Sequence, residues 1–238
     1  MAFNGDINFK GISSKAYPLI VVSPPSIIHS EVLTEEYTIP GKNGTLYGVN
    51  PYRGSAQIVV TFALVAQPGL VQNVSKYTSA WRLVRQWLQG TGKLIIGDSV
   101  DSYYEVQKVS ITSDERTVLR YGTLQVTFVI YPFEFLNVGD TGVSGGTIRN
   151  DGDIAYPLYK IVGSGSGTLT VNSKAMTYAV SGTLYIDTRR FIAYDASGNN
   201  KNSVLAGDYN NLLLQTGNNS VSASIGTLTV YPHYGYNI

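Results

Sequence analysis

The chain contains 238 residues with a formal net charge of +1, and only 14% of its residues are charged. Basic and acidic side chains are spread evenly, with 11 and 10 in residues 1–136 and 6 and 6 in residues 137–238. This balance excludes a basic surface for gripping nucleic acid, and the absence of cysteine excludes disulfides and thiolate metal sites.

The length is sufficient for one large all-β domain or two small domains with cores of their own. The longest apolar run, near Ile58–Ala66, is far shorter than the ~20 residues of a membrane-spanning helix, so we expect no membrane insertion. No basic stretch followed by an apolar run opens the chain, so we expect no secretion signal. The low charge has two interpretations: a surface covered by partners, or a β protein that uses Ser, Thr and Asn at its surface.

Three strands are predicted in the first half. Tyr17–Val22 is a short apolar segment closed by two prolines. Gln57–Ala66 is nearly all apolar, which suits a strand covered on both sides. Thr123–Ile130 alternates, with apolar residues on one face and Gln or Thr on the other. These patterns predict a β domain in residues 1–137.

One segment, Val71–Gln89, has helical spacing instead, and glycines at 90 and 92 end it. We expect a helix near residues 72–89. It carries two adjacent apolar stripes, one formed by Val74, Tyr77, Trp81, Val84 and Leu88 and the other by Ala80, Leu83 and Trp87. Such a wide apolar face indicates either a helix wedged into its own domain or a contact of Leu83 and Trp87 with a neighbouring subunit.

The composition and the predicted strand lengths change after residue 137. Gly139–Gly146 is rich in Gly, Ser and Thr, which predicts a linker. The strands expected beyond it are short and closely spaced, which predicts a small β-sandwich in residues 138–238. Those strands are Thr168–Asn172, Thr177–Val180, Thr183–Asp187, Arg190–Tyr194 and Thr227–Tyr231. A run of alternating glycine and serine, Gly163–Gly167, is interpreted as a β-turn rather than a phosphate loop, because it lacks the Lys-Ser/Thr of that motif.

The sequence contains few candidate catalytic or metal-binding residues. Its two histidines, His29 and His233, lie in no metal or nucleophile motif, and no credible acid–base pair of carboxylates is present. We therefore predict no enzymatic activity, no catalytic residue, no metal and no cofactor. An alternative function is recognition of host cell-wall sugars by the tyrosine-rich C-terminal half, with glycan or partner contacts at Tyr194, Tyr209 and Tyr234; the competing explanation is that tyrosine is a good strand former.

A series of weak motifs recurs along nearly the whole chain in an order and spacing that resembles the siphovirus distal tail protein family. The first half contributes a turn before an apolar strand, a helix-to-strand passage through glycine, an aromatic strand and a Tyr-Pro-Phe close, at Ile39–Gly44, Trp87–Leu94, Asp98–Tyr104 and Val126–Phe133. The second half contributes Asn150–Gly152 followed by Tyr156-Pro157, then Ile186-Asp187, Gly217–Val221 and Tyr231-Pro232.

The resemblance implies an all-β fold with one helix: an N-terminal β-sandwich-plus-helix ring domain and a galectin-like C-terminal sandwich. It implies a structural protein of the phage tail tip, assembled in the host cytoplasm as a homohexameric ring. The ring would join the tail-tube protein to the tail-tip hub protein and would anchor receptor-binding proteins. The chain matches a short form without carbohydrate-binding insertions. For the ring interface we predict Leu83 and Trp87, from the wide apolar face of the helix, and the glycine turn Gly41, Lys42, Asn43 and Gly44.

Overall fold

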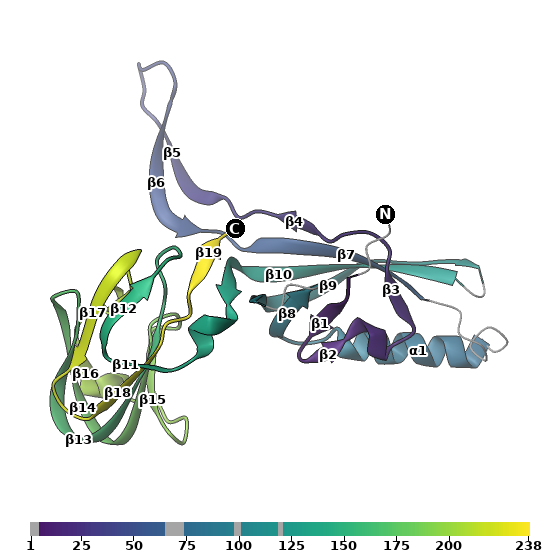
Figure 1. The fold of residues 1–238 in the computed structure, drawn as a ribbon. Coiled ribbons are helices and arrows are strands. Elements are labelled where there is room, and N and C mark those ends of the chain that lie inside the picture. Colours follow the sequence, from purple (N-terminus) through teal and green to yellow (C-terminus); the bar gives the residue numbers. More distant parts are fainter. Residues whose placement is uncertain (1–4, 65–73, 98–100, 119–120) are drawn as a thin grey trace. The chain divides into compact units, whose positions relative to one another are not determined.

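The computed structural model describes residues 5–64, 74–97, 101–118 and 121–238 (Figure 1). Its internal contacts divide the chain into two compact units, Met1–Glu134 with Ile238, and Phe135–Asn237. The expected fold class, all-β with one helix, is confirmed. The expected domain boundary between 137 and 138 stays a prediction. In the described part of the chain, no helix is long and apolar enough to cross a membrane.

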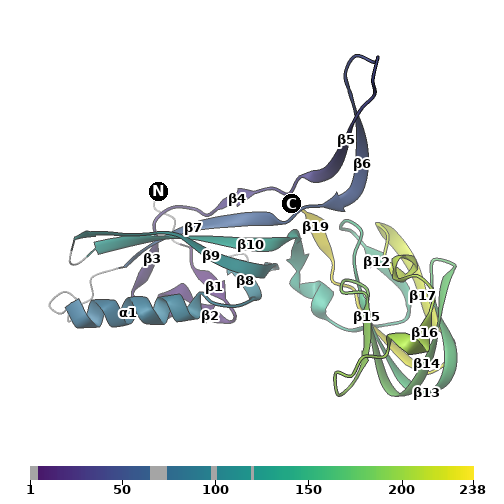
Figure 2. The ribbon, with the colours of Figure 1, turned by 180° about the vertical axis from the view of Figure 1, so that it is seen from behind.

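The N-terminal unit is built on one sheet with the strand order β2-β1-β8-β9-β10-β7-β3, and β4 also pairs with β7. A helix rather than a second sheet covers its apolar face, as Figure 2 shows for α1. The elements are β1 (Ile7–Phe9), β2 (Ile12–Ser13), β3 (Leu19–Val21), β4 (Ser26–Ile28), β7 (Ala56–Leu64), α1 (Val74–Trp87), β8 (Gly92–Ile96), β9 (Ser102–Val118) and β10 (Tyr121–Leu136).

Strict alternation explains the two central strands. β7 and β10 pair antiparallel from Thr123↔Ala63 to Ile130↔Ala56, so their apolar residues share one face. Burial of that face is nearly complete and confirms that both segments are strands: each residue of the set Ile58, Val60, Phe62, Leu124, Val126, Phe128 and Ile130 is 0% exposed. The expected cover on both sides of Gln57–Ala66 was wrong, because the other face of β7 is only partly buried. Burying side chains of this size contributes about 1.5–3 kcal/mol each.

The helix α1 packs on this face through Trp81, Val84, Trp87 and Leu88, which are all buried. Gly90 follows with φ +87°, the left-handed conformation that commonly ends a helix, so the predicted stop is confirmed. The side chains of Val74 and Tyr77, which were expected on the same stripe, lie outside the described residues, as does the start of the predicted helix at 72–73.

A hairpin of β5 (Val32–Thr38) and β6 (Thr45–Arg53) forms a second, two-stranded sheet in this unit (Figure 1). Thr38 pairs with Thr45, and residues 39–44 form the loop between the strands. Lys42 donates its backbone N–H to the carbonyl of Ile39 at 3.1 Å, and Gly41 has φ +84°. Proline followed by a left-handed glycine is the signature of a type II turn.

The C-terminal unit is a sheet that folds over on itself. β13 (Leu158–Val171) pairs with β14 (Lys174–Asp187) along its whole length, while its other edge pairs with β18 (Thr227–Tyr231) at its start and with β17 (Gly217–Ala223) at its end. The two ends therefore lie in different layers around one core. The remaining strands of this sheet are β11 (Val143–Ser144), β12 (Gly146–Asn150), β15 (Ile192–Asp195) and β16 (Leu205–Ala206), while β19 (Gly235–Asn237) pairs with β10.

Three predictions in this half were wrong, and glycine explains each. Gly139–Gly146 is not a free linker: Gly139 is buried, and a Cβ there would lie 2.4 Å from the backbone nitrogen of Tyr234. Gly163–Gly167 is not a turn but part of β13, and Gly182 lies inside β14 rather than between two strands. At Gly163 a Cβ would lie 2.8 Å from the Cα of Gly226. Gly139 and Gly163 thus permit close approach of backbones, whereas at Gly182 a Cβ would meet nothing within 4 Å and the positive φ of 93° favours glycine.

Candidate functional site

The two helix residues predicted at a subunit interface have opposite environments. Trp87 is only 3% exposed, and its indole Nε1 donates to the carbonyl of Phe9 at 3.2 Å. Its ring packs near Tyr17 and edge-on to Phe9 and Phe62. The prediction that Trp87 meets a neighbour is therefore replaced by a core role, because its surface is already covered. Leu83 is 56% exposed, and its place at an interface stays a prediction.

The β5–β6 hairpin carries an exposed apolar surface, which we call the hairpin surface: Val32, Leu33, Tyr37, Ile39, Leu46 and Tyr47, each between 38% and 60% exposed. All residues of β5 are exposed. Because successive strand residues point to opposite faces, Leu46 and Tyr47 lie on different faces of the hairpin. Apolar groups on both faces, uncovered by the described parts of the chain, are typical of a surface that another protein covers.

The glycine turn at the end of this hairpin is exposed from Gly41 to Gly44. A Cβ placed at Gly41 or Gly44 would meet nothing within 4 Å, so the positive φ angles, and not crowding, call for glycine there. The loop contains one charge, that of Lys42. The predicted role of these four residues in a ring stays a prediction.

The three tyrosines predicted to contact a glycan or partner do not share one environment. Tyr194 stacks on Tyr185, with ring centroids 5.1 Å apart. Tyr209 meets Phe191 edge-on at 5.6 Å. Burial, and then the charge of Asp187, raises the pKa of both Tyr194 and Tyr209.

For Tyr234, burial and then the charge of Asp151 raise the pKa instead. This ring packs against the core of the C-terminal unit. The electrostatic neighbours thus group Tyr194 with Tyr209 and separate Tyr234 from them. Contact of any of the three with a glycan or partner stays a prediction.

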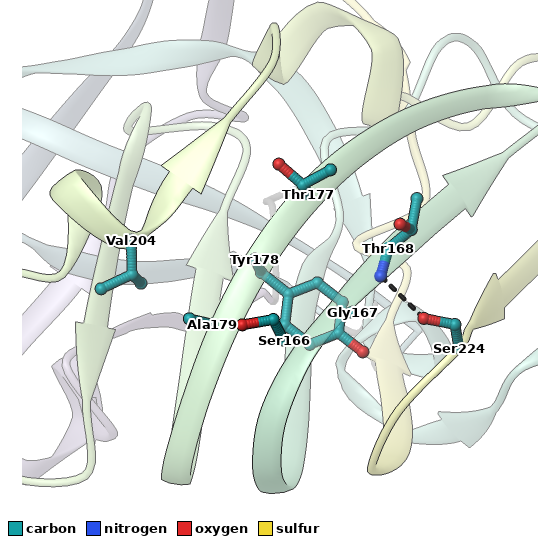
Figure 3. Close-up of a pocket in the computed structure, with 8 residues that line it drawn as sticks. All are labelled: Ser166, Gly167, Thr168, Thr177, Tyr178, Ala179, Val204 and Ser224. Carbon is teal, nitrogen blue, oxygen red and sulfur yellow. Dashed lines mark hydrogen bonds between the residues drawn. The ribbon is translucent and has the colours of Figure 1, made fainter.

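A shallow pocket of about 440 Å³ lies on the C-terminal unit (Figure 3). Thr168 donates its backbone N–H to Ser224 Oγ at 2.8 Å on one side of it. Gly167 lets the pocket's only aromatic ring pass close beneath the strand, since a Cβ there would lie 2.8 Å from the hydroxyl of Tyr178. The lining is uncharged and rich in hydroxyls: Ser166, Gly167, Thr168, Thr177, Tyr178, Ala179, Val204 and Ser224.

Sequence reasoning missed this pocket. Its only signal is the alternation of Gly and Ser in residues 163–167, which we interpreted as a turn. An alternation of small residues inside a strand leaves a hollow where side chains would otherwise stand. The residues that line the pocket are determined by the register of β13 with β14. That register could not be predicted from the local pattern.

The two histidines lie in different environments. His29 is exposed. His233 is largely buried, with Nδ1 3.2 Å from the carbonyl oxygen of Tyr156 and Nε2 3.8 Å from Asp140 Oδ1. Burial, and then the Arg189 guanidinium, lowers the pKa of His233. Among the residues that the structure describes, no group of three or more His, Asp or Glu is arranged to hold a metal ion.

Two motifs that carry the family resemblance are explained by buried asparagines. Asn150 and Asn219 are both 0% exposed. Asn150 donates to the carbonyl of Asp153 at 2.6 Å and accepts from the N–H of Gly152 at 3.1 Å. Asn219 bonds both the N–H and the carbonyl of Gln215. Because unpaired buried polar groups cost free energy, these amides fix their loops, so the motifs are determinants of the fold.

The architecture defines a two-unit β protein with one helix, whose most conspicuous exposed features are an apolar hairpin and an uncharged pocket. No family model and no curated protein sequence matches the chain. The chain is similar in structure to the SPP1 Dit (gp 19.1) protein, whose crystal structure is described as a paradigm of the hub adsorption apparatus in phages that infect Gram-positive bacteria. The match has a TM-score of 0.66 and covers 94% of this chain and 96% of that one, at 11% sequence identity. The chain therefore shares the Dit fold over nearly its whole length.

Proposed function

We propose that this chain is a structural subunit of the tail tip of a long-tailed phage, a distal tail protein of the short form. It assembles as a homohexameric ring that joins the tail-tube protein to the tail-tip hub protein and anchors receptor-binding proteins. The observation that carries the proposal is the fold match, which spans 94% of this chain and 96% of the Dit protein and so includes both units. The ring forms in the host cytoplasm and is part of the virion, with no enzymatic activity.

The exposed apolar groups support assembly. A closed ring needs a heterologous interface, in which two different patches of the same chain meet. The hairpin surface supplies one candidate patch, and Leu83 on α1 marks another. Permanent assemblies bury ~2,000–5,000 Å² per contact with apolar character, which suits side chains such as Leu46 and Tyr47 that nothing in the described chain covers.

The charge distribution fits a conduit for DNA. A protein that grips DNA neutralises phosphates with Lys and Arg, and this chain has a net charge of +1 without a basic half. On the face of the sheet opposite α1, the partly exposed residues Thr61, Gln125 and Thr127 are uncharged, and Thr127 shares a hydrogen bond of 2.9 Å with Thr112. The lack of a basic half fits a protein along which a duplex slides, and it predicts no sequence-specific binding.

Electron microscopy of the full chain tests the proposal, alone at high concentration and co-expressed with tail-tube and hub proteins. We expect six-fold rings with a central hole in at least one of these samples. Tyr47→Asp on the hairpin surface should prevent rings while leaving a folded monomer. Tyr236→Asp is the matched control, because Tyr236 is 44% exposed but lies outside that surface. Monomers in all samples, including the co-expressed ones, would contradict the ring.

A second candidate function is recognition of host cell-wall carbohydrate, and the hydroxyl-lined pocket favours it because sugars are bound through neutral hydrogen-bonding groups. Ala179→Trp should fill the pocket and abolish binding of the full chain to purified host cell walls. Ala175→Trp, an exposed position on the same strand outside the pocket, should leave binding unchanged. Absence of binding by the unmodified chain would remove this function.

A further inference from the structure

The loop of the β5–β6 hairpin contains the dipeptide Asn43-Gly44, whose surroundings leave it unusually open. Both residues are exposed. Gly44 has φ +90°, and a Cβ placed on it would meet nothing within 4 Å. Within the described part of the chain, neither the Gly44 N–H nor the Asn43 side-chain amide has a hydrogen-bond partner, whereas the neighbouring Lys42 N–H bonds to Ile39. The side-chain carbonyl of Asn43 and the next backbone nitrogen are therefore both free to react.

We propose that Asn43 is a site of spontaneous deamidation. The deprotonated backbone nitrogen of Gly44 attacks Cγ of Asn43, forming a new C–N bond in a cyclic imide and expelling the side-chain nitrogen as ammonia. Water then hydrolyses the imide at either carbonyl, giving aspartate or isoaspartate. Glycine favours the ring closure because it has no side chain to obstruct the approach and adopts backbone angles that other residues avoid. Asparagine is among the thermolabile residues for this reason.

Asn172 provides an internal comparison in the same molecule. It also lies in a hairpin turn, between β13 and β14, but its side chain is held at both ends. Its Nδ2 donates to Asn219 Oδ1 at 2.6 Å, and its Oδ1 accepts the N–H of Ser220 at 3.0 Å. The next residue is Ser173, which carries a Cβ. Because Cγ is fixed and the next residue is bulkier, Asn172 should resist the reaction that consumes Asn43.

The reaction changes both charge and backbone at the end of the hairpin. Lys42 carries the only charge of loop 39–44, and a carboxylate at Asn43 neutralises it. Isoaspartate also adds an atom to the main chain, which disturbs the turn that Gly41 and Gly44 permit. If the hairpin surface is a subunit contact, which rests on the proposed function, protein that waits unassembled loses the ability to enter a ring.

The test uses the unmodified full chain, incubated in ¹⁸O-labelled water at mildly alkaline and at mildly acidic pH, then digested with an acid protease and analysed by mass spectrometry. We expect progressive loss of the unmodified Asn43 peptide at alkaline pH, with aspartate and isoaspartate products that carry the label. The Asn172 peptide should stay intact, and Asn43→Gln should abolish the signal. Loss of Asn43 no faster than loss of Asn172 would overturn the proposal.

A synthetic peptide of residues 37–47 sets the rate for an unrestrained chain. Conversion in the folded protein at a rate close to that of the peptide supports an open loop, and strong protection in the protein would overturn it. Ring formation is scored separately by microscopy for Asn43→Asp against Asn43→Gln. Deamidation without any ring leaves the proposed site intact and contradicts only the proposed function, so the two failures are distinguishable.

Discussion

Two β-hairpins of the molecule, β13–β14 and β5–β6, are stabilised in different ways. β13–β14 pairs along 14 residues of each strand and closes with the two-residue turn Asn172-Ser173, at φ 48° and 69°. Two positive φ angles define the type I′ turn, whose twist matches that of the strands. One face of this hairpin is buried: Ile161, Leu169, Met176 and Tyr178 are each at most 2% exposed.

The β5–β6 hairpin lacks both features. Its strands are joined by the longer loop 39–44, and none of the residues of β5 is buried. A two-stranded hairpin alone is marginally stable in water at best. Both hairpins are held by backbone hydrogen bonds between their strands. Only β13–β14 also buries one face in the core of its own unit, whereas β5–β6 leaves its apolar side chains for another protein to cover.

Proteolysis should show the largest difference. Each hairpin has an exposed lysine at its turn, Lys42 in one and Lys174 in the other. Local opening near the end of an uncovered hairpin requires little free energy, while opening of a core hairpin approaches global unfolding. Trypsin should therefore cut the monomer after Lys42 long before it cuts after Lys174, as followed by mass spectrometry. Equal cleavage rates would show that the two hairpins open equally easily, and protection of Lys42 in rings would show that a neighbouring subunit covers the β5–β6 hairpin.

Truncating an apolar side chain should affect stability in only one hairpin. Ile161→Ala in β13 removes a fully buried side chain and should lower the free energy of unfolding by about 2–5 kcal/mol. Leu46→Ala in β6, where the side chain is 42% exposed, should change it by less than about 0.5 kcal/mol. Urea denaturation of the monomers measures both. A large effect of Leu46→Ala would mean that the hairpin surface is covered within the chain.

The turns offer a smaller contrast at matched residues. Asn172→Ala loses two side-chain hydrogen bonds and places alanine at φ 48°, and the left-handed conformation alone costs alanine about 1–2 kcal/mol. Asn43→Ala should stay within about 0.5 kcal/mol, as at other exposed sites. Thermal unfolding of the two variants provides the measurement, and similar losses would show that the loop of β5–β6 is also structured by its asparagine.

Acid should act on the C-terminal unit through His233, with the smallest effect. Its pKa in the folded protein is lowered from the ordinary 6.5, by burial first and Arg189 next, although Asp140 and Asp187 oppose the shift. A lowered histidine pKa means that the stabilisation is fully present above 6.5 and is lost as the pH falls through the folded pKa. His233→Asn, which tolerates φ 50°, should reduce the loss of stability between neutral and mildly acidic pH. An unchanged pH profile would exclude His233 as its source.

The sequence predicted the core strands better than the glycine-rich segments. Alternation located β10, because the side chains of a half-buried strand reveal its period, and a nearly continuous apolar run located β7. The break predicted inside β14 was wrong, because Ser181 and Gly182 resemble a turn locally while they pair with Gly163 and Ser164 across the sheet. Such long-range pairing is absent from the local pattern, and the pocket at Gly167 was missed for the same reason.

Helical spacing likewise predicted α1 but not the use of each face. Trp87 and Leu83 belong to one expected stripe, yet one is buried and the other exposed. The orientation of a helix on its sheet depends on which side chains fit the facing strands, here Trp87 against Phe9 and Phe62. The exposed Gly41–Gly44 turn was predicted from its composition, whereas the apolar hairpin beneath it was not, because its residues show no consistent alternation.

The chain passes between its two units twice, after Glu134 and again before Ile238. Ile238 donates its N–H to the carbonyl of Pro132 at 3.2 Å and accepts the N–H of Ser30 at 3.0 Å, so the returning strand end is anchored in the first unit. One peptide bond, between Glu134 and Phe135, joins two long segments, whereas the second crossing leads to one residue that backbone hydrogen bonds retain in the sheet of the first unit.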